Sequence, residues 1–198
     1  MPVPYTLLGT NKVQAGLFSA HQDLGSLVTF KIDTLYNHRE NNEANAETST
    51  IFLRVLRSTT NYTISPVLTF HLPESWTVSI NGLYGDEKDY LNQPIYSGGS
   101  LASRSDNCYC DKVKSWEINS EGALLSLPGG DVRTALWVGY RKNSFDEHSL
   151  ITTSRSLYQE HSYYGFAEIY LPLASPESNI PLNNYRSSPG FAGVAVTV

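Results

Sequence analysis

The sequence predicts an all-β fold, an antiparallel up-and-down meander that forms part of a transmembrane β-barrel with short periplasmic turns and long extracellular loops. Three observations predict it. Apolar and polar residues alternate along successive segments, and short turns containing Gly or Pro alternate with long polar stretches. The composition of the 198 residues also favours strands, with 13 Tyr and only 17% charged residues.

The alternation is clearest in five segments. Within these segments, the first of which shows the pattern from Val28, the even-numbered residues are mostly apolar and the odd-numbered ones are mostly polar. Because successive residues of a strand point to opposite faces, each such segment has one apolar and one polar face. The segments are 27–36, 61–72, 77–84, 115–124 and 132–141. A sixth segment, 163–173, is apolar on both faces except at Glu168, and a weaker seventh spans 12–22. Pro66 lies on an apolar face although proline donates no ladder hydrogen bond.

Short and long connections alternate between these segments. Three tight turns are expected at 23–26, 73–75 and 128–130. Between them lie three polar stretches of about twenty residues each, 38–58, 87–110 and 144–162, which we expect to be loops. A meander then has its turns at one end and its loops at the other. Soluble domains rarely carry three such loops, whereas membrane barrels do.

Aromatic residues lie near the segment ends, where the two membrane–water interfaces of a barrel are rich in Tyr and Trp. Tyr36, Tyr84 and Tyr140 lie near the long connections, and Trp76 lies next to a tight turn. We therefore expect the apolar faces to contact lipid. The alternation is also compatible with a soluble or secreted β-sandwich whose apolar faces pack on each other. Such a sandwich would be a carbohydrate-binding module that uses its Tyr-rich loops.

Four motifs follow one another at a distinctive spacing. They are EGALLSLPGGDVR at 121–133, VGYR at 138–141, YYGFAEIYLPLASPE at 163–177 and NIP at 179–181. In this order they resemble the barrel of TonB-dependent outer-membrane receptors. The resemblance covers about residues 61–181, including the pair Cys108 and Cys110, and residues 182–198 depart from the family pattern.

The resemblance implies that residues 1–198 form one unit, a middle part of the barrel with seven or eight strands and without a signal peptide or plug. The intact receptor would actively take up a scarce ligand, such as a siderophore, a cobalamin or an oligosaccharide, across the bacterial outer membrane. Its implied partners are outer-membrane lipid, the plug domain and the TonB system. The fragment is not expected to function alone.

Candidate ligand or plug contacts come from two sources. Charged residues on the polar faces would line the inside of a barrel, and tyrosines in the long loops would meet a ligand, as they do in receptors of the resembled family. The first set is Lys31, Asp33, Glu117, Glu121, Arg133, Arg141 and Glu168, and the second is Tyr90, Tyr96 and Tyr109.

Other functions find little support in the sequence. A net charge of −5 gives no reason to expect nucleic-acid binding. The chain contains no Gly-rich phosphate loop and no nucleophile elbow. The triplet Asp146-Glu147-His148 offers acid–base or metal-binding groups, but we interpret it as solvated loop residues. No enzymatic activity and no cofactor is therefore expected.

The two cysteines, Cys108 and Cys110, are separated only by Tyr109. They form either a local disulfide or two free thiols in a loop. A zinc site would need two further ligands, which the scattered histidines do not obviously supply. No metal site is therefore predicted.

Overall fold

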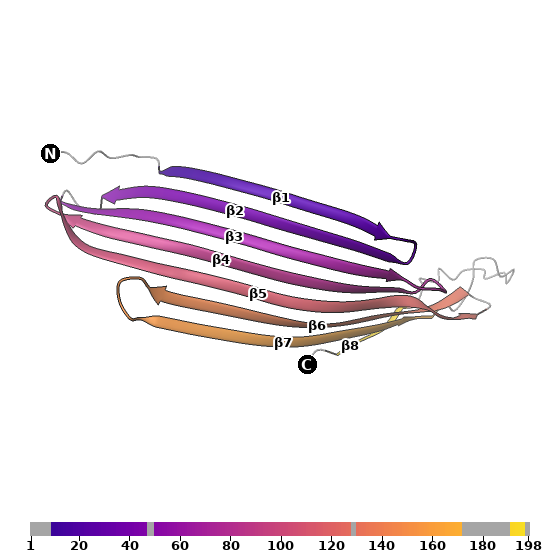
Figure 1. The fold of residues 1–198 in the computed structure, drawn as a ribbon. Coiled ribbons are helices and arrows are strands. Elements are labelled where there is room, and N and C mark those ends of the chain that lie inside the picture. Colours follow the sequence, from indigo (N-terminus) through magenta and orange to yellow (C-terminus); the bar gives the residue numbers. More distant parts are fainter. Residues whose placement is uncertain (1–8, 47–49, 128–129, 172–190, 197–198) are drawn as a thin grey trace, which may run out of the picture.

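The structure, a computed structural model, describes residues 9–46, 50–127, 130–171 and 191–196. These residues form one antiparallel sheet of eight strands that follow one another in sequence order (Figure 1). The strands are β1 (Thr10–Leu24), β2 (Val28–Ala46), β3 (Ile51–His71), β4 (Thr77–Ser97), β5 (Ser100–Leu127), β6 (Gly130–Ser149), β7 (Arg155–Tyr170) and β8 (Phe191–Val196). The predicted all-β antiparallel meander is thus confirmed.

Helices are absent from the described part of the chain. Accordingly, no described segment is an apolar helix long enough to cross a bilayer.

The strand register confirms the predicted division into two faces. Cross-strand pairing places the even-numbered residues of β2, β3, β4 and β6 on one face, together with most even-numbered residues of β5 and the odd-numbered residues of β7. We call this surface the Ile64 face and the opposite one the Glu117 face. The apolar residues Phe30, Ile80 and Val138 lie on the Ile64 face, whereas Ser79 and Asn119 lie on the Glu117 face.

The three predicted long loops are wrong. Their residues extend the strands, so that β2 continues to Ala46, β4 to Ser97 and β6 to Ser149. The connections on that rim that the structure describes are short: the two glycines 98–99 and the segment 150–154. The physical reason is that these strand extensions are rich in polar residues on both faces, and that the apolar residues they contain, as in 51–56, do not alternate with polar ones. The extensions pair through their backbones and lack the apolar alternation from which a strand is recognised.

The predicted turns at the other rim are confirmed where the structure describes them. Residues 25–27 connect β1 to β2, with Gly25 at φ 74°, a conformation that glycine adopts without strain. Residues 72–76 connect β3 to β4, and the Leu72 N–H donates to the Trp76 carbonyl at 2.8 Å. Residues 128–129 of the third predicted turn lie outside the described residues, and Gly130 begins β6.

Pro66 is accommodated by a glycine across the sheet. The pairing of β3 with β4 runs from Ile64 opposite Tyr84 to Val67 opposite Asn81 and omits Ser65 and Pro66. Gly82 lies at this gap, where a Cβ atom would be only 3.1 Å from Cγ of Pro66. Pro66, which has no backbone N–H to donate, therefore lies across from a residue without a side chain. This leaves room for the proline ring, and β3 continues past it.

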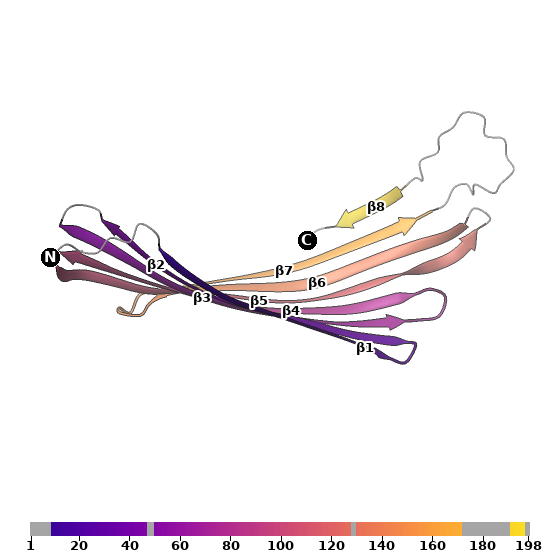
Figure 2. The same ribbon diagram turned by 90° about the horizontal axis from the view of Figure 1, so that it is seen from above.

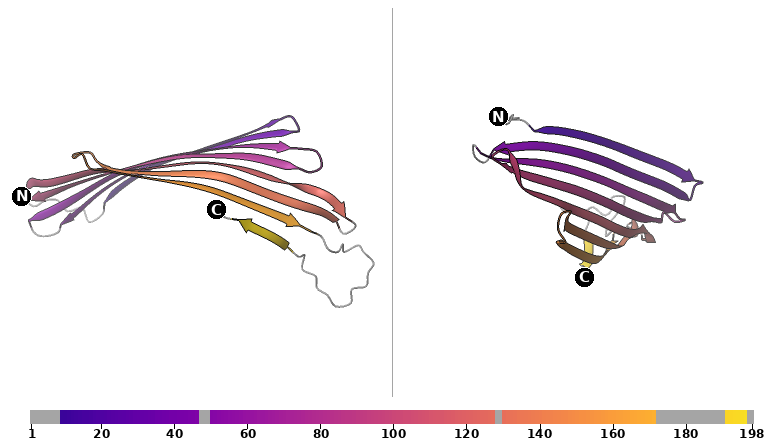
Figure 3. Two further views of the ribbon diagram at one scale, coloured as in Figure 1. Left: turned by 90° about the horizontal axis from the view of Figure 1, so that it is seen from below. Right: turned by 60° about the vertical axis from the view of Figure 1, so that its left-hand side comes forward.

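The sheet is strongly twisted and does not close on itself (Figures 2 and 3). β1 forms one edge, and β8 pairs only with residues 165–170 of β7 at the other. The first half of β7 therefore forms a second unpaired edge among the described residues.

Burial in this sheet is the reverse of that in a soluble globular protein. Among the described residues the buried hydrophobic side chains are Cys108 and Val132, while Asp86, Asp89 and Asp106 are also buried. The alternative of a sandwich is wrong for this part of the chain. The residue sets around Ile64 and around Leu136, which a sandwich would pack against each other, lie on the same face of one sheet.

Candidate functional site

An apolar band covers the half of the Ile64 face that lies nearest the 25–27 and 72–76 turns, which we call the turn-proximal half. It consists of Val28, Phe30, Ile32, Ile64, Leu68, Phe70, Val78, Ile80, Ile118, Leu136, Val138, Ala167 and Ile169. Ile80, Leu136 and Val138 are 42%, 47% and 49% exposed. A contiguous apolar surface spread over six strands is far larger than soluble monomers usually expose. The band therefore requires an apolar medium or partner.

A row of aromatic side chains borders this band. It comprises Tyr36 on β2, Tyr62 on β3, Tyr84 on β4, Trp116 on β5, Tyr140 on β6 and Tyr163 on β7. Ring centroids are 5.7 Å apart for Tyr62 and Tyr84, and 5.0 Å apart for Tyr140 and Tyr163. At the other border Trp76 lies over Gly122 and donates from Nε1 to the Ala123 carbonyl at 2.9 Å. Beyond the aromatic row begins the second half of the sheet, which we call the far half.

The turn-proximal half of the Glu117 face carries the charged residues predicted for the inside of a barrel. All seven, Lys31, Asp33, Glu117, Glu121, Arg133, Arg141 and Glu168, lie on this face. Lys31 Nζ lies 2.8 Å from Asp33 Oδ2, and Ser19 donates to Asp33 Oδ1 at 2.6 Å. Within the described ranges no ion pair engages the side chains of Glu121, Arg133 or Glu168.

Glu117 is held in place by a tyrosine from two strands away. The register places Gly139 between Glu117 on β5 and Tyr164 on β7. The Tyr164 ring covers Gly139, where any Cβ would lie 2.4 Å from ring atom Cε2. The Tyr164 hydroxyl thereby reaches Glu117 Oε1 and donates to it at 2.5 Å. Trp137 packs edge-on against the same ring at 5.7 Å.

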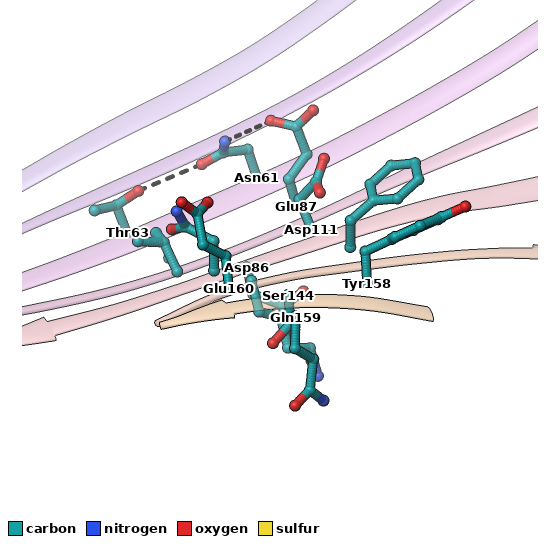
Figure 4. A pocket seen from close by; sticks show the side chains of 14 residues that line it. Asn61, Thr63, Asp86, Glu87, Asp111, Ser144, Tyr158, Gln159 and Glu160 are labelled. Atoms are coloured by element: carbon teal, nitrogen blue, oxygen red, sulfur yellow. Dashed lines mark hydrogen bonds and ion pairs between the residues drawn. The ribbon is translucent and has the colours of Figure 1, made fainter. Parts of the chain in front are cut away.

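A hollow of about 590 Å³ lies on the Glu117 face in the far half of the sheet (Figure 4). One cross-strand row supplies five of its lining residues, one from each of β3 to β7: Asn61, Glu87, Asp111, Phe145 and Tyr158. Glu160 lines it from the next row. No local motif connects these residues, which is why the sequence did not reveal them.

The hollow is acidic and partly aromatic. Asn61 Nδ2 donates to Glu87 Oε2 at 2.8 Å, and the rings of Phe145 and Tyr158 lie 6.4 Å apart. Burial, and next the neighbouring Glu87 carboxylate, raise the pKa of Asp111. Lys112 also borders the hollow, but it extends from the Ile64 face, where its Nζ lies 3.4 Å from Asp86. Carboxylates, an amide and two rings can bind a ligand through hydrogen bonds, charge and stacking.

An ion pair stabilises the strands just beyond the hollow. Arg57 on β3 donates from Nε to both carboxylate oxygens of Asp89 on β4, each at 2.9 Å. Thr59 Oγ1 donates to Asp89 Oδ1 at 3.0 Å. The hydrogen bond from Arg57 lowers the pKa of Asp89. The ionised Asp89 side chain therefore links β4 to β3 through Arg57 and Thr59.

The three tyrosines predicted as loop contacts are not brought together. Tyr90 and Tyr96 lie on β4 on the Ile64 face, whereas Tyr109 lies on β5 on the Glu117 face, opposite Asp89. All three belong to strands, so their placement in loops was wrong. Tyr109 is the one that lies on the face of the hollow, two residues from Asp111.

The triplet Asp146-Glu147-His148 does not form one cluster, although Asp146 Oδ1 and His148 Nδ1 lie 3.5 Å apart, and its assignment to a loop is wrong. It belongs to β6, so Glu147 points to the face opposite that of its two neighbours. Asp146 instead accepts hydrogen bonds from Arg155 Nε and Nη2 at 2.9 and 2.8 Å. These hydrogen bonds lower the pKa of Asp146. His148 lies opposite Cys108, a neighbour that the sequence spacing did not suggest.

Comparison with known proteins supplies no relative. No family model matches the chain, and neither curated proteins nor solved structures show significant similarity to it. The resemblance to TonB-dependent receptors therefore stays a prediction that rests on the motifs of the sequence.

Proposed function

We propose that this chain is a section of the wall of a bacterial outer-membrane β-barrel of the TonB-dependent receptor kind, which in intact form takes up a scarce ligand. The observation that carries the proposal is the apolar band on one face, bounded by an aromatic row, with charged residues on the opposite face. An outward apolar band between aromatic girdles, with a polar interior, is the arrangement typical of membrane barrels.

The depth of the band supports this proposal. From Val28 to Tyr36 on β2, and from Tyr62 to Phe70 on β3, the band is nine residues deep. A tilted strand needs about 9–11 residues to cross the hydrocarbon core. The strands continue beyond the aromatic row, and those extensions would stand in water outside the membrane.

The open edges of the sheet support a role as one part of a larger wall. Unpaired backbone N–H and C=O groups cost several kcal/mol each in hydrocarbon, so a membrane sheet has to close. Since the outer edge of β1 and the first half of β7 find no pairing strand among the described residues, the proposed wall needs further strands or further copies to close.

The Glu117 face supports a receptor role. Inside a barrel, the charges of Glu121, Arg133 and Glu168, which form no ion pair with another described residue, would contact a plug domain. The acidic hollow would lie above them on the ligand side. The hollow combines carboxylates with the rings of Phe145 and Tyr158, which suits a cationic or polyhydroxylated ligand. The proposed role is binding and uptake, without catalysis.

The proposal is tested by the behaviour of the full chain with and without lipid. We expect the chain expressed alone to form inclusion bodies and to give no soluble monomer in buffer, because its apolar band and free edges associate. After refolding with phospholipid vesicles it should float with them in a density gradient and resist extraction at high salt. A soluble monomer that melts cooperatively and does not bind vesicles would refute the proposal.

A further inference from the structure

The two cysteines lie beside a histidine on a neighbouring strand. Cys108 and Cys110 are two residues apart on β5 and therefore point to the same side, the Ile64 face. The register pairs Cys108 with His148 and Cys110 with Asp146 on β6. Both Sγ atoms and a ring nitrogen of His148 lie within 4.8 Å of one another. In the structure the two sulfurs form a disulfide.

Two buried polar atoms on this side of the sheet make no hydrogen bond among the described residues. Cys108 is fully buried. His148 Nδ1 and Asp106 Oδ1 are buried and accept or donate no hydrogen bond among the described residues. The nearest charged atom to His148 Nδ1 in an ion pair is Asp146 Oδ1, at 3.5 Å. Native proteins rarely leave such atoms unsatisfied, and an absent ion is one recognised reason for it.

We propose that Cys108, Cys110 and His148 form a redox-gated site that binds one thiophilic metal ion, such as Zn²⁺, when the disulfide is reduced. Two thiolates and an imidazole are three of the four ligands of the tetrahedral sites that Zn²⁺ prefers. Water completes the set, because the carboxylates of Asp106 and Asp146 already form ion pairs with Arg104 and Arg155. The site lies on the face opposite the acidic hollow and is independent of ligand uptake.

The redox step is balanced by an external thiol or phosphine reductant. The reductant supplies two electrons, the S–S bond breaks, and two protons enter to give two thiols. Metal binding then displaces both protons into solvent, because thiolates are the form that ligates metal. In the oxidised chain each sulfur is bonded to the other and is not a thiolate. The disulfide and the metal therefore exclude each other.

The test uses the full chain refolded in detergent, in oxidised form and after reduction with a phosphine that is then removed without air. Co²⁺ serves as the first probe, because thiolate ligation gives a charge-transfer band in the near ultraviolet. Zn²⁺ is then titrated against a chromophoric chelator. We expect one ion per reduced chain with the thiolate band, and no such band in the oxidised chain.

A histidine substitution identifies the third ligand. His148→Ala should weaken Zn²⁺ binding by about tenfold or more. His161→Ala is the matched control, since His161 lies on the same face of β7 and contacts the Tyr140 hydroxyl at 2.8 Å instead. This control should bind Zn²⁺ like the unaltered chain.

Three results would overturn the proposal. They are a reduced unaltered chain that shows no thiolate–cobalt band, a His148→Ala chain with unchanged Zn²⁺ affinity, and a loss of the β-sheet circular dichroism signal on reduction alone. The first and third are measured on the unaltered chain, so they decide the matter even if a variant fails to fold.

Discussion

The two halves of the Ile64 face suit different surroundings, although the same strands run through both. The turn-proximal half exposes Ile80, Leu136 and Val138, while the far half buries Asp86 and Asp106, which are only 5% and 8% exposed. The backbone pairing of β4, β5 and β6 continues across the border between the halves. Because backbone hydrogen bonds hold the strands together in both halves, the polarity of the side chains can differ between the halves without loss of strand pairing. Under the proposed function, the change at the aromatic row corresponds to the border between lipid and water.

The largest effect is expected from placing a charge in the apolar band. Ile80→Arg should lower the free energy of unfolding of the vesicle-bound chain by about 2–4 kcal/mol, because a midplane Arg on a lipid face has this cost. Its control is Ser79→Arg, one residue earlier on the opposite face, which should change little. The measurement is a urea titration followed by tryptophan fluorescence. An equal loss of unfolding free energy in the two variants would mean that lipid does not contact the Ile64 face in preference to the Glu117 face.

In the far half, loss of the Asp89 carboxylate should have the next largest effect. Asp89→Ala removes the charge-assisted hydrogen bonds from Arg57 and Thr59 and should cost about 1–3 kcal/mol. This cost should disappear at high salt only in part, since the Asp89 side chain is just 7% exposed.

The same pair predicts a pH dependence. Since the pKa of Asp89 in the folded chain lies below its ordinary value of 3.8, the pair stabilises the fold at all pH values above about 4. This contribution is lost as the pH falls below 3.8 through the lower folded pKa. Unfolding midpoints measured between pH 7 and pH 2 should therefore converge for the unaltered chain and Asp89→Ala. Midpoints that stay equally far apart at pH 2 would contradict the assignment.

A smaller effect separates two neighbouring tyrosines on opposite faces. Tyr164→Phe removes the hydroxyl that donates to Glu117 and should cost about 0.5–1.5 kcal/mol. Tyr163→Phe is the matched control, because Tyr163 is 67% exposed and none of the described residues hydrogen-bonds to its hydroxyl. Thermal unfolding by circular dichroism measures both. A larger loss for Tyr163→Phe would contradict a stabilising role of the part-buried Tyr164–Glu117 hydrogen bond.

The smallest expected effect is a gain in stability at the acidic hollow. Burial and Glu87 raise the pKa of Asp111, so its ionised form destabilises the folded chain. The stability penalty is absent below the ordinary pKa of 3.8 and develops as the pH rises through the higher folded pKa. Asp111→Asn should therefore raise stability at pH 7 by less than about 1 kcal/mol and change nothing at pH 3. Melting temperatures at the two pH values measure this difference.

Sequence reasoning succeeded where side chains alternate and failed where they do not. The alternation around Phe30, Ile64 and Val138 assigned strands and faces correctly, because a single buried or lipid-facing surface imposes a period of two. The extensions beyond the aromatic row carry polar residues on both faces, such as Asp86 on the Ile64 face and Asp89 on the Glu117 face, and so resemble loops in sequence. Their pairing comes from backbone hydrogen bonds, which every residue except proline can donate.

The residues of the hollow could not be recognised in the sequence for a related reason. Glu87, Asp111 and Glu160 lie on three different strands and meet only because the register aligns them or places them in adjacent rows. His148 meets Cys108 by the same means. The register is fixed by turns and pairing along the whole sheet. No local sequence motif therefore predicts the residues of the hollow or the approach of His148 to Cys108.

The central claim, that the Ile64 face contacts lipid and the Glu117 face does not, is tested most directly by two tryptophans. Trp116 on the Ile64 face and Trp137 on the Glu117 face are 48% and 41% exposed, so accessibility alone does not distinguish them. Two variants of the full chain each retain one of them, with Trp76 and the other replaced by Phe, and each is refolded into vesicles of brominated phospholipid. We predict strong quenching of Trp116 fluorescence and little quenching of Trp137. Equal quenching, or stronger quenching of Trp137, would contradict the assignment of the faces.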